Sequence, residues 1–165
     1  MTAALATRTD HRLIRVVLTG PALSRLSPVL EADRAQAVTD LEAENRFAPV
    51  LPAAAGGPFV LHLSILDGRL VFDIRDAADT PLLAVGLALG PFRALVKDYE
   101  LLVESYATAI AEGREARIQA IDMGRRGLHD EGARLLAARL AGKIAIDFPT
   151  ARRLFTLVCV LHQRG

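Results

Sequence analysis

The sequence predicts an α+β fold: a small, mostly antiparallel β-meander sheet packed by helices on one face, with a helical C-terminal half. Alternating and β-branched segments around an Asp67-Gly68 turn predict the sheet. Apolar residues at helical spacing, from residue 92 onward, predict the helices. The chain has 165 residues, 52% of them hydrophobic, which is enough for one core. We therefore expect a disordered N-terminus at 1–10 and a single domain at 11–165.

The first predicted strand covers His11–Thr19, which is rich in β-branched residues. A helix should begin at Ser27-Pro28, because the serine hydroxyl can cap it and proline at the first helical position loses no hydrogen bond. That helix should run to about Glu44. The following segment, Phe47–Pro58, contains three prolines and two adjacent glycines. It predicts a loop.

A β-hairpin is predicted for Phe59–Leu66 and Arg69–Arg75. Asp67-Gly68 suits a two-residue type I′ turn, in which both central residues need positive φ. The turn fixes the register, and a slip of one residue would send half of the apolar side chains to water. In the predicted register six large apolar residues share one face: Leu61, Leu63, Ile65, Leu70, Phe72 and Ile74.

The near-continuous apolar run Leu82–Leu89 predicts the central strand of the meander. Gly90-Pro91 then opens an amphipathic helix that Gly113 ends.

Three C-terminal helices should follow, over residues 115–123, 130–141 and 149–163, with an interruption at 124–127 (Gly-Arg-Arg-Gly). Residues 143–146 are short enough for either a loop or an edge strand. The last helix is apolar on nearly every side. Such a helix is buried, either in the core or at a subunit interface.

The sequence indicates a soluble, cytoplasmic protein without a membrane segment. Residues 1–12 lack the apolar run of a signal peptide, and no apolar stretch approaches the ~20 residues that span a bilayer. The single cysteine excludes an intramolecular disulfide. No glycine-rich phosphate motif is present, so no cofactor is indicated.

The C-terminal third is basic, with 10 basic and 5 acidic residues after residue 112. Within it, Arg125 and Arg126 lie between glycines, where backbone N–H groups and guanidinium groups can surround an anion. Arg152 and Arg153 lie in the first turn of the last helix, where the dipole disfavours cations unless an anion is near. If these segments meet, the four arginines and His129 form a candidate anion-binding site.

The same arginines also fit two roles that need no small anion. Asp122 and Asp147 are close enough in sequence to form ordinary ion pairs with them. An acidic protein partner is the second alternative. A nucleic-acid partner is disfavoured, because aromatic residues make up 5% of the chain and single-stranded recognition uses aromatic platforms.

The predicted hairpin register also places His62 opposite Asp73, with Ser64 on the same face. A histidine oriented by an aspartate beside a hydroxyl is the arrangement of nucleophilic catalysis. The alternative, which we favour, is a solvated cross-strand pair. Whether the protein is an enzyme stays open.

No metal site is predicted. The nearest candidates lack the spacing of a three- or four-ligand zinc motif. They are His129, Asp130, Glu131, Cys159 and His162.

Four stretches together resemble one family: FDIRD (Phe72–Asp76), GPFRALVKDY (Gly90–Tyr99), IDMGRRGLH (Ile121–His129) and DFPTARRLFTLVCVLH (Asp147–His162). They are similar to bacterial uncharacterised protein family 0262, a group of conserved hypothetical proteins. The resemblance implies a bacterial protein and, since the family has no assigned activity or cofactor, transfers no site.

From these observations we expect a non-catalytic interaction or regulatory module that forms a homo-oligomer. The absence of catalytic motifs and the surplus of apolar residues in the last helix favour this hypothesis. The alternative is a small-anion or nucleotide-binding protein, with or without catalysis, that uses the arginine cluster.

Overall fold

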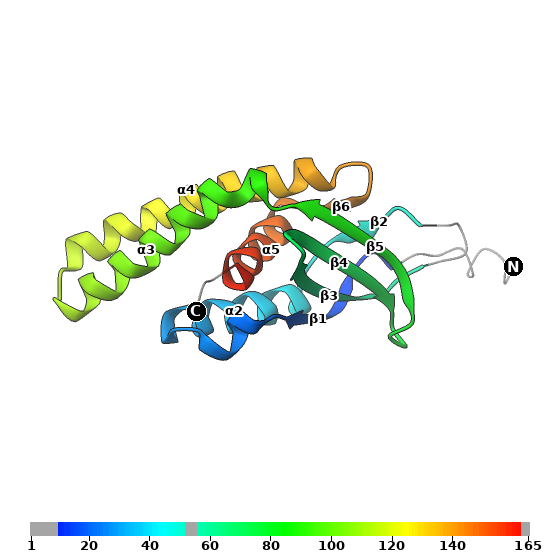
Figure 1. The fold of residues 1–165 in the computed structure, drawn as a ribbon, viewed down its shortest axis with the longest axis horizontal. Coiled ribbons are helices and arrows are strands. Elements are labelled where there is room, and N and C mark those ends of the chain that lie inside the picture. The colour runs from blue at the N-terminus through cyan, green and yellow to red at the C-terminus, as the bar shows by residue number, and fades with distance from the viewer. Residues whose placement is uncertain (1–9, 52–55, 163–165) are drawn as a thin grey trace, which may run out of the picture.

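The computed structural model describes residues 10–51 and 56–162. All but residue 10 of the predicted disordered N-terminus therefore lies outside the described residues. A four-stranded sheet is covered on one face by helices, and a two-stranded sheet lies beside it (Figure 1). The elements in order are β1 (Leu13–Thr19), η1 (Pro21–Arg25), α2 (Pro28–Ala43), β2 (Phe47–Pro49), β3 (Phe59–Leu66), β4 (Arg69–Asp76), β5 (Pro81–Ala88), η2 (Gly90–Phe92), α3 (Arg93–Ala111), α4 (Glu115–Leu140), β6 (Ile144–Ile146) and α5 (Phe148–Leu161).

The main sheet has the order β1-β3-β4-β5, with β1 parallel to β3 and the other pairs antiparallel. The predicted hairpin is confirmed: Leu66 pairs with Arg69, and Asp67 and Gly68 have φ values of 52° and 73°. Both central residues therefore have the positive φ that a type I′ turn requires. Five of the six predicted inward side chains are fully buried, and Ile65 is partly buried.

The edge of β1 is covered by polar side chains from the end of α2 and the residues after it. Asn45 accepts a hydrogen bond from the Leu13 N–H (2.7 Å) and donates one to the Leu13 carbonyl (2.8 Å). The Glu42 carboxylate accepts from the Val16 N–H (3.0 Å). These bonds occupy backbone groups that would otherwise be free to pair with another strand.

The prediction of a central strand at Leu82–Leu89 was wrong, because β5 is the opposite edge of the sheet. Its inward residues Val85 and Leu87 are buried, whereas Ala84 and Gly86 on the outer face are exposed. The run is continuously apolar because its outward positions hold small residues, not because both faces are buried.

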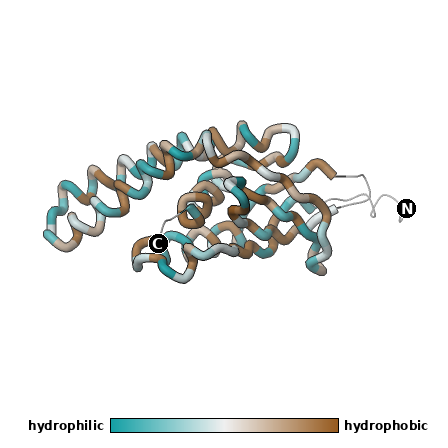
Figure 2. The backbone as a smooth tube through the Cα atoms, viewed as in Figure 1, coloured by the Kyte–Doolittle hydropathy of each residue, from teal (hydrophilic) through white to brown (hydrophobic). Residues whose placement is uncertain are grey.

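Helix α5 lies against the inner face of the sheet and is buried on every side from Leu154 to Leu161 (Figures 1 and 2). Of the two locations expected for this apolar helix, the structure shows the core. Ser27 caps α2 as predicted, since its hydroxyl accepts from the Leu30 N–H at 3.3 Å.

Two helices, not three, follow α3, because α4 continues through the expected interruption at 124–127. A Cβ at Gly124 would make only an ordinary contact, 3.5 Å from the Leu102 Cδ2 of α3, and one at Gly127 would meet no atom within 4 Å. Packing of α4 against α3 and α5 outweighs the cost of about 1 kcal/mol that each glycine has in a helix, so the segment does not form a turn.

The predicted loop over Phe47–Pro58 was wrong at its start, where β2 pairs antiparallel with β6. Phe47 is fully buried and lies 6.3 Å, ring to ring, from Phe59. Because Phe47 is buried in the core, the residues around it form a short strand instead of a loop. Residues 52–55 of the predicted loop lie outside the described residues.

Helices α3 and α4 form an antiparallel hairpin that turns at Gly113, where φ is 66°. The end of this hairpin extends beyond the sheet and the other helices (Figure 1). We refer to residues 101–126 as the arm. Figure 2 shows that hydrophobic and hydrophilic residues alternate along it.

A glycine in α4 tests how closely α4 and α5 must approach. A Cβ at Gly132 would lie 2.5 Å from the Phe155 ring of α5, whereas one at Gly127 would meet no atom within 4 Å. We expect Gly132→Ala to lower the free energy of unfolding by about 1–3 kcal/mol through overpacking. The control Gly127→Ala should leave it unchanged or raise it by up to about 1 kcal/mol, because alanine favours helix. Urea denaturation measures both, and equal effects would contradict the packing described.

Candidate functional site

The two predicted arginine doublets lie together between α4 and α5. A hollow of about 270 Å³ is lined by Asp122, Arg125, Arg126, His129 and Arg152. A second hollow of about 200 Å³ shares His129 and Arg152 and adds Pro149, Arg153 and Thr156. We call the two hollows together the arginine pocket. It contains all five side chains of the candidate anion site.

Arg125 is held by a partly buried carboxylate from α2, Asp33. Its guanidinium donates to Asp33 Oδ2 at 2.8 Å, and the Tyr99 hydroxyl donates to the same oxygen at 2.5 Å. The guanidinium also lies 5.8 Å from the centre of the Tyr106 ring, in a cation–π contact. Burial, followed by the Asp33 charge, raises the pKa of the Tyr99 hydroxyl. Arg125, which lies on α4, therefore contacts side chains of both α2 and α3.

The other three arginines are less fully engaged. Arg152 Nε lies 3.2 Å from Asp130 Oδ1, but its direction leaves the buried N–H without a hydrogen-bond acceptor among the described residues. Arg153 donates to the Glu44 carbonyl at 3.1 Å. Arg126 is exposed, and no described residue forms an ion pair or hydrogen bond with it. Arg126 is thus the group most accessible to a ligand, whereas the Arg152 Nε–H is buried but unsatisfied.

The expected acidic partners have other positions. Asp147 caps α5 by accepting from the Thr150 N–H at 3.0 Å. Asp122 lines the arginine pocket but, within the described part of the chain, forms no ion pair with either doublet. Sequence spacing pointed to these carboxylates, whereas the arginines reach Asp33 and Asp130.

His129 is a buried, neutral member of the pocket. Its Nδ1 donates to the Arg125 carbonyl at 2.7 Å, since a carbonyl can only accept. The ring packs edge-on against Tyr99 and Phe155, at 5.8 and 5.9 Å. Burial, and then the positive charges of Arg125 and Arg152, lowers the pKa of His129. The imidazole therefore adds no positive charge to the pocket near neutral pH.

The charges around the pocket nearly cancel. Its four arginines are accompanied by Asp33, Asp122 and Asp130, so the net charge of the group is about +1. An anion would therefore gain little from long-range attraction and would depend on direct hydrogen bonds.

The predicted His62–Asp73 pair is opposite in register, but the hydrogen bond of His62 goes elsewhere. His62 Nε2 lies 2.8 Å from Asp79 Oδ1, while Asp73 accepts from Arg75 at 2.9 Å. The hydrogen bond from His62, first, and the Arg75 charge lower the pKa of Asp79. Asp73 is thus not the carboxylate that orients His62. Sequence reasoning missed Asp79 because it lies in the turn after β4, with φ at 67°.

The candidate metal ligands do not assemble. Among the described residues, no three His, Cys, Asp or Glu side chains are grouped closely enough to hold a metal ion. Cys159 is completely buried, and burial raises the pKa of its thiol. No described helix is both long and apolar enough to cross a membrane.

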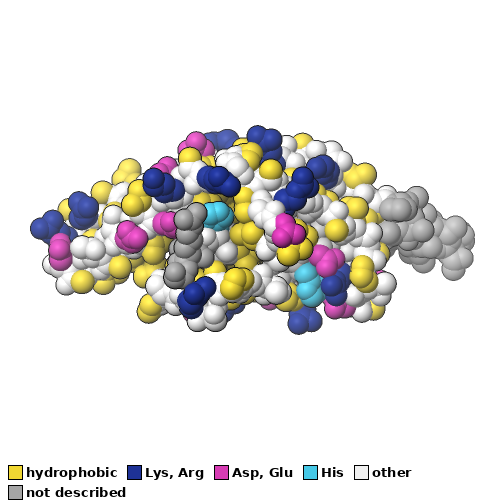
Figure 3. Space-filling model, viewed as in Figure 1, with side chains coloured by type: hydrophobic (Ala, Val, Ile, Leu, Met, Phe, Trp, Pro, Cys, Tyr) yellow, Lys and Arg dark blue, Asp and Glu magenta, His cyan; other side chains and the backbone are white. Residues whose placement is uncertain are grey.

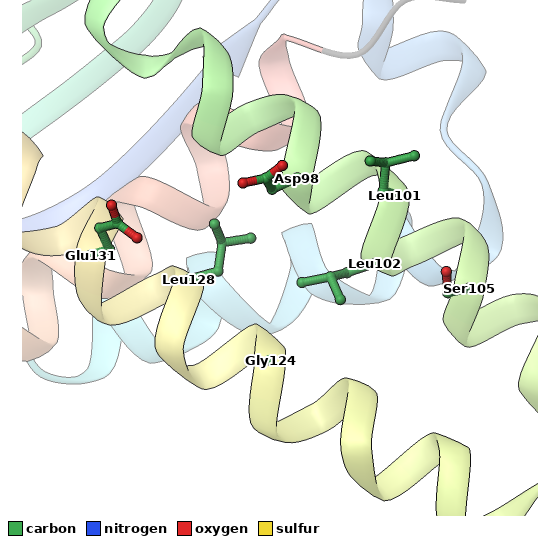
Figure 4. A pocket seen from close by; sticks show the side chains of 7 residues that line it. All are labelled: Asp98, Leu101, Leu102, Ser105, Gly124, Leu128 and Glu131. Carbon is green, nitrogen blue, oxygen red and sulfur yellow. The ribbon is translucent and has the colours of Figure 1, made fainter.

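Sequence reasoning missed a hollow of about 410 Å³ between α3 and α4, which we call the hairpin hollow. Leu102 and Leu128 point into it, and the carboxylates of Asp98 and Glu131 lie at one end (Figure 4). The hollow arises where two helices diverge, which single-helix periodicity does not show. Its lining residues are Asp98, Leu101, Leu102, Ser105, Gly124, Leu128 and Glu131.

Residues 10–164 match a family described as "Uncharacterised protein family (UPF0262)". A UPF0262 protein of Granulibacter bethesdensis is 66% identical, over 94% of this chain and 92% of its own length. One from Acidiphilium cryptum is 62% identical, covering 93% and 94%. A third, from Rhodopseudomonas palustris, is 50% identical over the whole of both chains. No solved structure is significantly similar to this chain.

The lowered pKa of His129 predicts how stability depends on pH. The unfolded chain takes up a proton near the ordinary histidine pKa of about 6.5, whereas folded His129 does so only at lower pH. The contribution of neutral His129 is therefore complete above that value and is lost as pH falls toward the folded pKa. We expect His129→Asn to flatten the fall of the unfolding free energy between about pH 7.5 and 5.5. His11→Asn, at an exposed site, should leave the slope unchanged, and equal slopes in all three proteins would refute this role of His129.

Proposed function

We propose that this chain, which belongs to the UPF0262 family, is a non-catalytic interaction module that binds a partner protein through its arm and the hairpin hollow at the base of the arm. The position of the arm and its exposed apolar side chains support this proposal most directly. It extends beyond the core that the sheet, α2 and α5 form (Figure 1), and it keeps large apolar side chains at its surface. Leu101 and Ile110 are each 52% exposed, and Met123 is 72% exposed.

These apolar side chains add nothing to the core of the monomer. The arm buries Val103, Ala109 and Ile121 between its own helices and the body. Figure 3 shows charged side chains of both signs around the exposed apolar ones. Apolar surface with a polar rim is typical of a protein-binding site.

The chemistry around α3 indicates the kind of partner. On one side, the hairpin hollow has a leucine-lined floor and two carboxylates, Asp98 and Glu131. On the other side, a groove of about 570 Å³ between α3 and the start of α2 combines apolar residues with Glu100 and Glu104. Complementary charge and apolar contact favour a partner segment that presents leucine-like side chains next to lysine or arginine. An amphipathic basic helix has this pattern.

A synthetic amphipathic peptide with leucines on one face and flanking lysines tests the proposal. We expect it to bind, as measured by fluorescence anisotropy, and to perturb the NMR signals of Leu102 and Leu128. Asp98→Lys with Glu131→Lys should weaken binding by about tenfold or more, because like charges then meet at the end of the hollow.

A matched control separates this site from general charge attraction. Glu112→Lys with Glu115→Lys makes the same change of charge at the tip of the arm, where both residues are exposed. This control should bind the peptide as the unaltered protein does. If both double variants lose the same affinity, or the peptide does not bind, the proposed docking site is wrong.

A second candidate function is small-anion binding in the arginine pocket. The specific observation that favours it is the convergence of both doublets, with Arg126 unengaged by described residues and the buried Arg152 Nε–H lacking an acceptor. A phosphate or carboxylate group could accept from both. The near-neutral charge of the group makes this candidate the weaker of the two.

Inorganic phosphate tests this candidate in a thermal unfolding assay, against potassium chloride at equal ionic strength. A ligand at 100 times its dissociation constant should stabilise the protein by about 2.7 kcal/mol. Arg126→Gln with Arg152→Gln should abolish the shift, whereas Arg117→Gln with Arg134→Gln, on the exposed surface of α4, should preserve it. No phosphate-specific shift, or a shift that survives the first pair of substitutions, would exclude the pocket as an anion site.

A further inference from the structure

We infer that the free edge of β5 is a strand-pairing site for a second copy of this chain. This inference goes beyond the arm and does not rest on it. Strand β5 is hydrogen-bonded to β4 on one side and is the last strand of the sheet. The Leu89 N–H bonds to the Gly68 carbonyl at 3.4 Å, in line with the β4–β5 register. Since bonded pairs alternate along an antiparallel ladder, the backbone groups of Leu82, Ala84, Gly86 and Ala88 face the free edge.

Within the described residues, this edge has none of the usual protection against pairing. The sequence carries no charged residue from Thr80 to Phe92, and Pro81 affects only the first strand position. Gly86 is exposed, and because glycine has no side chain, this exposure is exposure of the backbone. By contrast, Asn45 and Glu42 occupy the edge of β1. Side chains of the same chain therefore cover the edge of β1, whereas among the described residues none covers the edge of β5 in this way.

The sequence of β5 is suited to antiparallel pairing with itself. A two-fold axis at Val85 places Leu83 opposite Leu87 and Ala84 opposite Gly86 of the second copy. Residues of equal or similar size then meet at the centre of the pairing, whereas Leu82 meets the smaller Ala88 at each end. Leu83, Val85 and Leu87 would continue the apolar inner face of one sheet into the other.

Charges on the outer face are complementary in the same arrangement. The Arg69 guanidinium lies over Gly86, 3.7 Å from the position that a Cβ would take. Asp73 is the β4 partner of Ala84. Pairing Gly86 with Ala84 of the second copy therefore puts Arg69 in line with Asp73 of that copy. Only the two small residues lie between them, and neighbouring strands are ~4.8 Å apart.

The size of the contact predicts a weak dimer. Seven paired residues span ~24 Å, and a sheet is ~10 Å deep, so the strand edge alone buries only about 240 Å² on each copy. A standard stable interface buries ~800 Å² on each partner. Association should therefore be weaker than micromolar and should appear toward the millimolar concentration range.

Sedimentation velocity of the full chain, from micromolar to millimolar concentration, tests the inference. We expect a reversible monomer–dimer equilibrium. Ala84→Lys with Gly86→Lys should leave a monomer, because each new lysine meets a lysine of the other copy. A side chain fits at Gly86 with ordinary contacts, so the fold should persist, as an unchanged thermal midpoint would confirm. Ala116→Lys with Ala120→Lys, on the exposed surface of the arm, is the matched control and should dimerise normally.

A cross-link reports the register directly. Val85 would pair with Val85 of the second copy in a non-hydrogen-bonded pair, where the Cα separation suits a disulfide. Mild oxidation should therefore link the Val85→Cys protein into a covalent dimer. In the Ala88→Cys protein the two new cysteines would lie six residues apart along the paired strands, so this protein should stay unlinked. The buried Cys159 provides little background.

The outcomes separate this inference from the proposed function. A monomer at all concentrations, or a dimer that survives Ala84→Lys with Gly86→Lys, overturns the β5 site. A dimer lost only in the Ala116→Lys, Ala120→Lys protein also overturns it and assigns self-association to the arm. None of these results changes the peptide-binding test of the arm.

Discussion

The contact between the Phe155 ring and the backbone of α4 at Gly132 is the constraint on which the helical half depends. It brings α5 so close to α4 that no Cβ fits between them. Next to it, His129 packs edge-on against Phe155 and Tyr99, and Tyr99 shares Asp33 with Arg125. Four helices thus meet at one junction. Its buried polar groups are paired, which is what makes their burial tolerable.

The position of this junction explains where the exposed surfaces lie. α4 is supported by α5 in its C-terminal half, so the opposite end of the α3–α4 hairpin extends as the arm (Figure 1). The same contact brings the arginine doublets together, but Asp33 of α2 and Asp130 of α4 lie beside them and neutralise much of their charge. Binding through apolar surface therefore has stronger support than binding through charge. The unprotected edge of β5 adds a second exposed surface at the other side of the fold.

Local chemistry was sufficient to predict several elements. The Asp67-Gly68 turn determined the hairpin register, because only one turn type fits that pair and only one register buries the apolar face. Ser27 caps the helix that follows it, as its sequence position predicted. The burial of α5 followed from its composition. These features depend on residues that are neighbours in sequence or on a single repeating pattern.

Other features were decided by contacts between distant segments. Whether β5 is a central or an edge strand depends on whether another strand pairs with its second side. The small residues at its outward positions did not reveal that none does in this sheet. Residues 124–127 remain helical because α4 packs against α3 and α5. Arg125 pairs with a carboxylate 92 residues away, not with its neighbour Asp122. By itself the sequence thus determined the hairpin, the start of α2, the burial of α5 and the residues of the pocket. Only the tertiary structure decided their order and partners, because these arise from packing across the core.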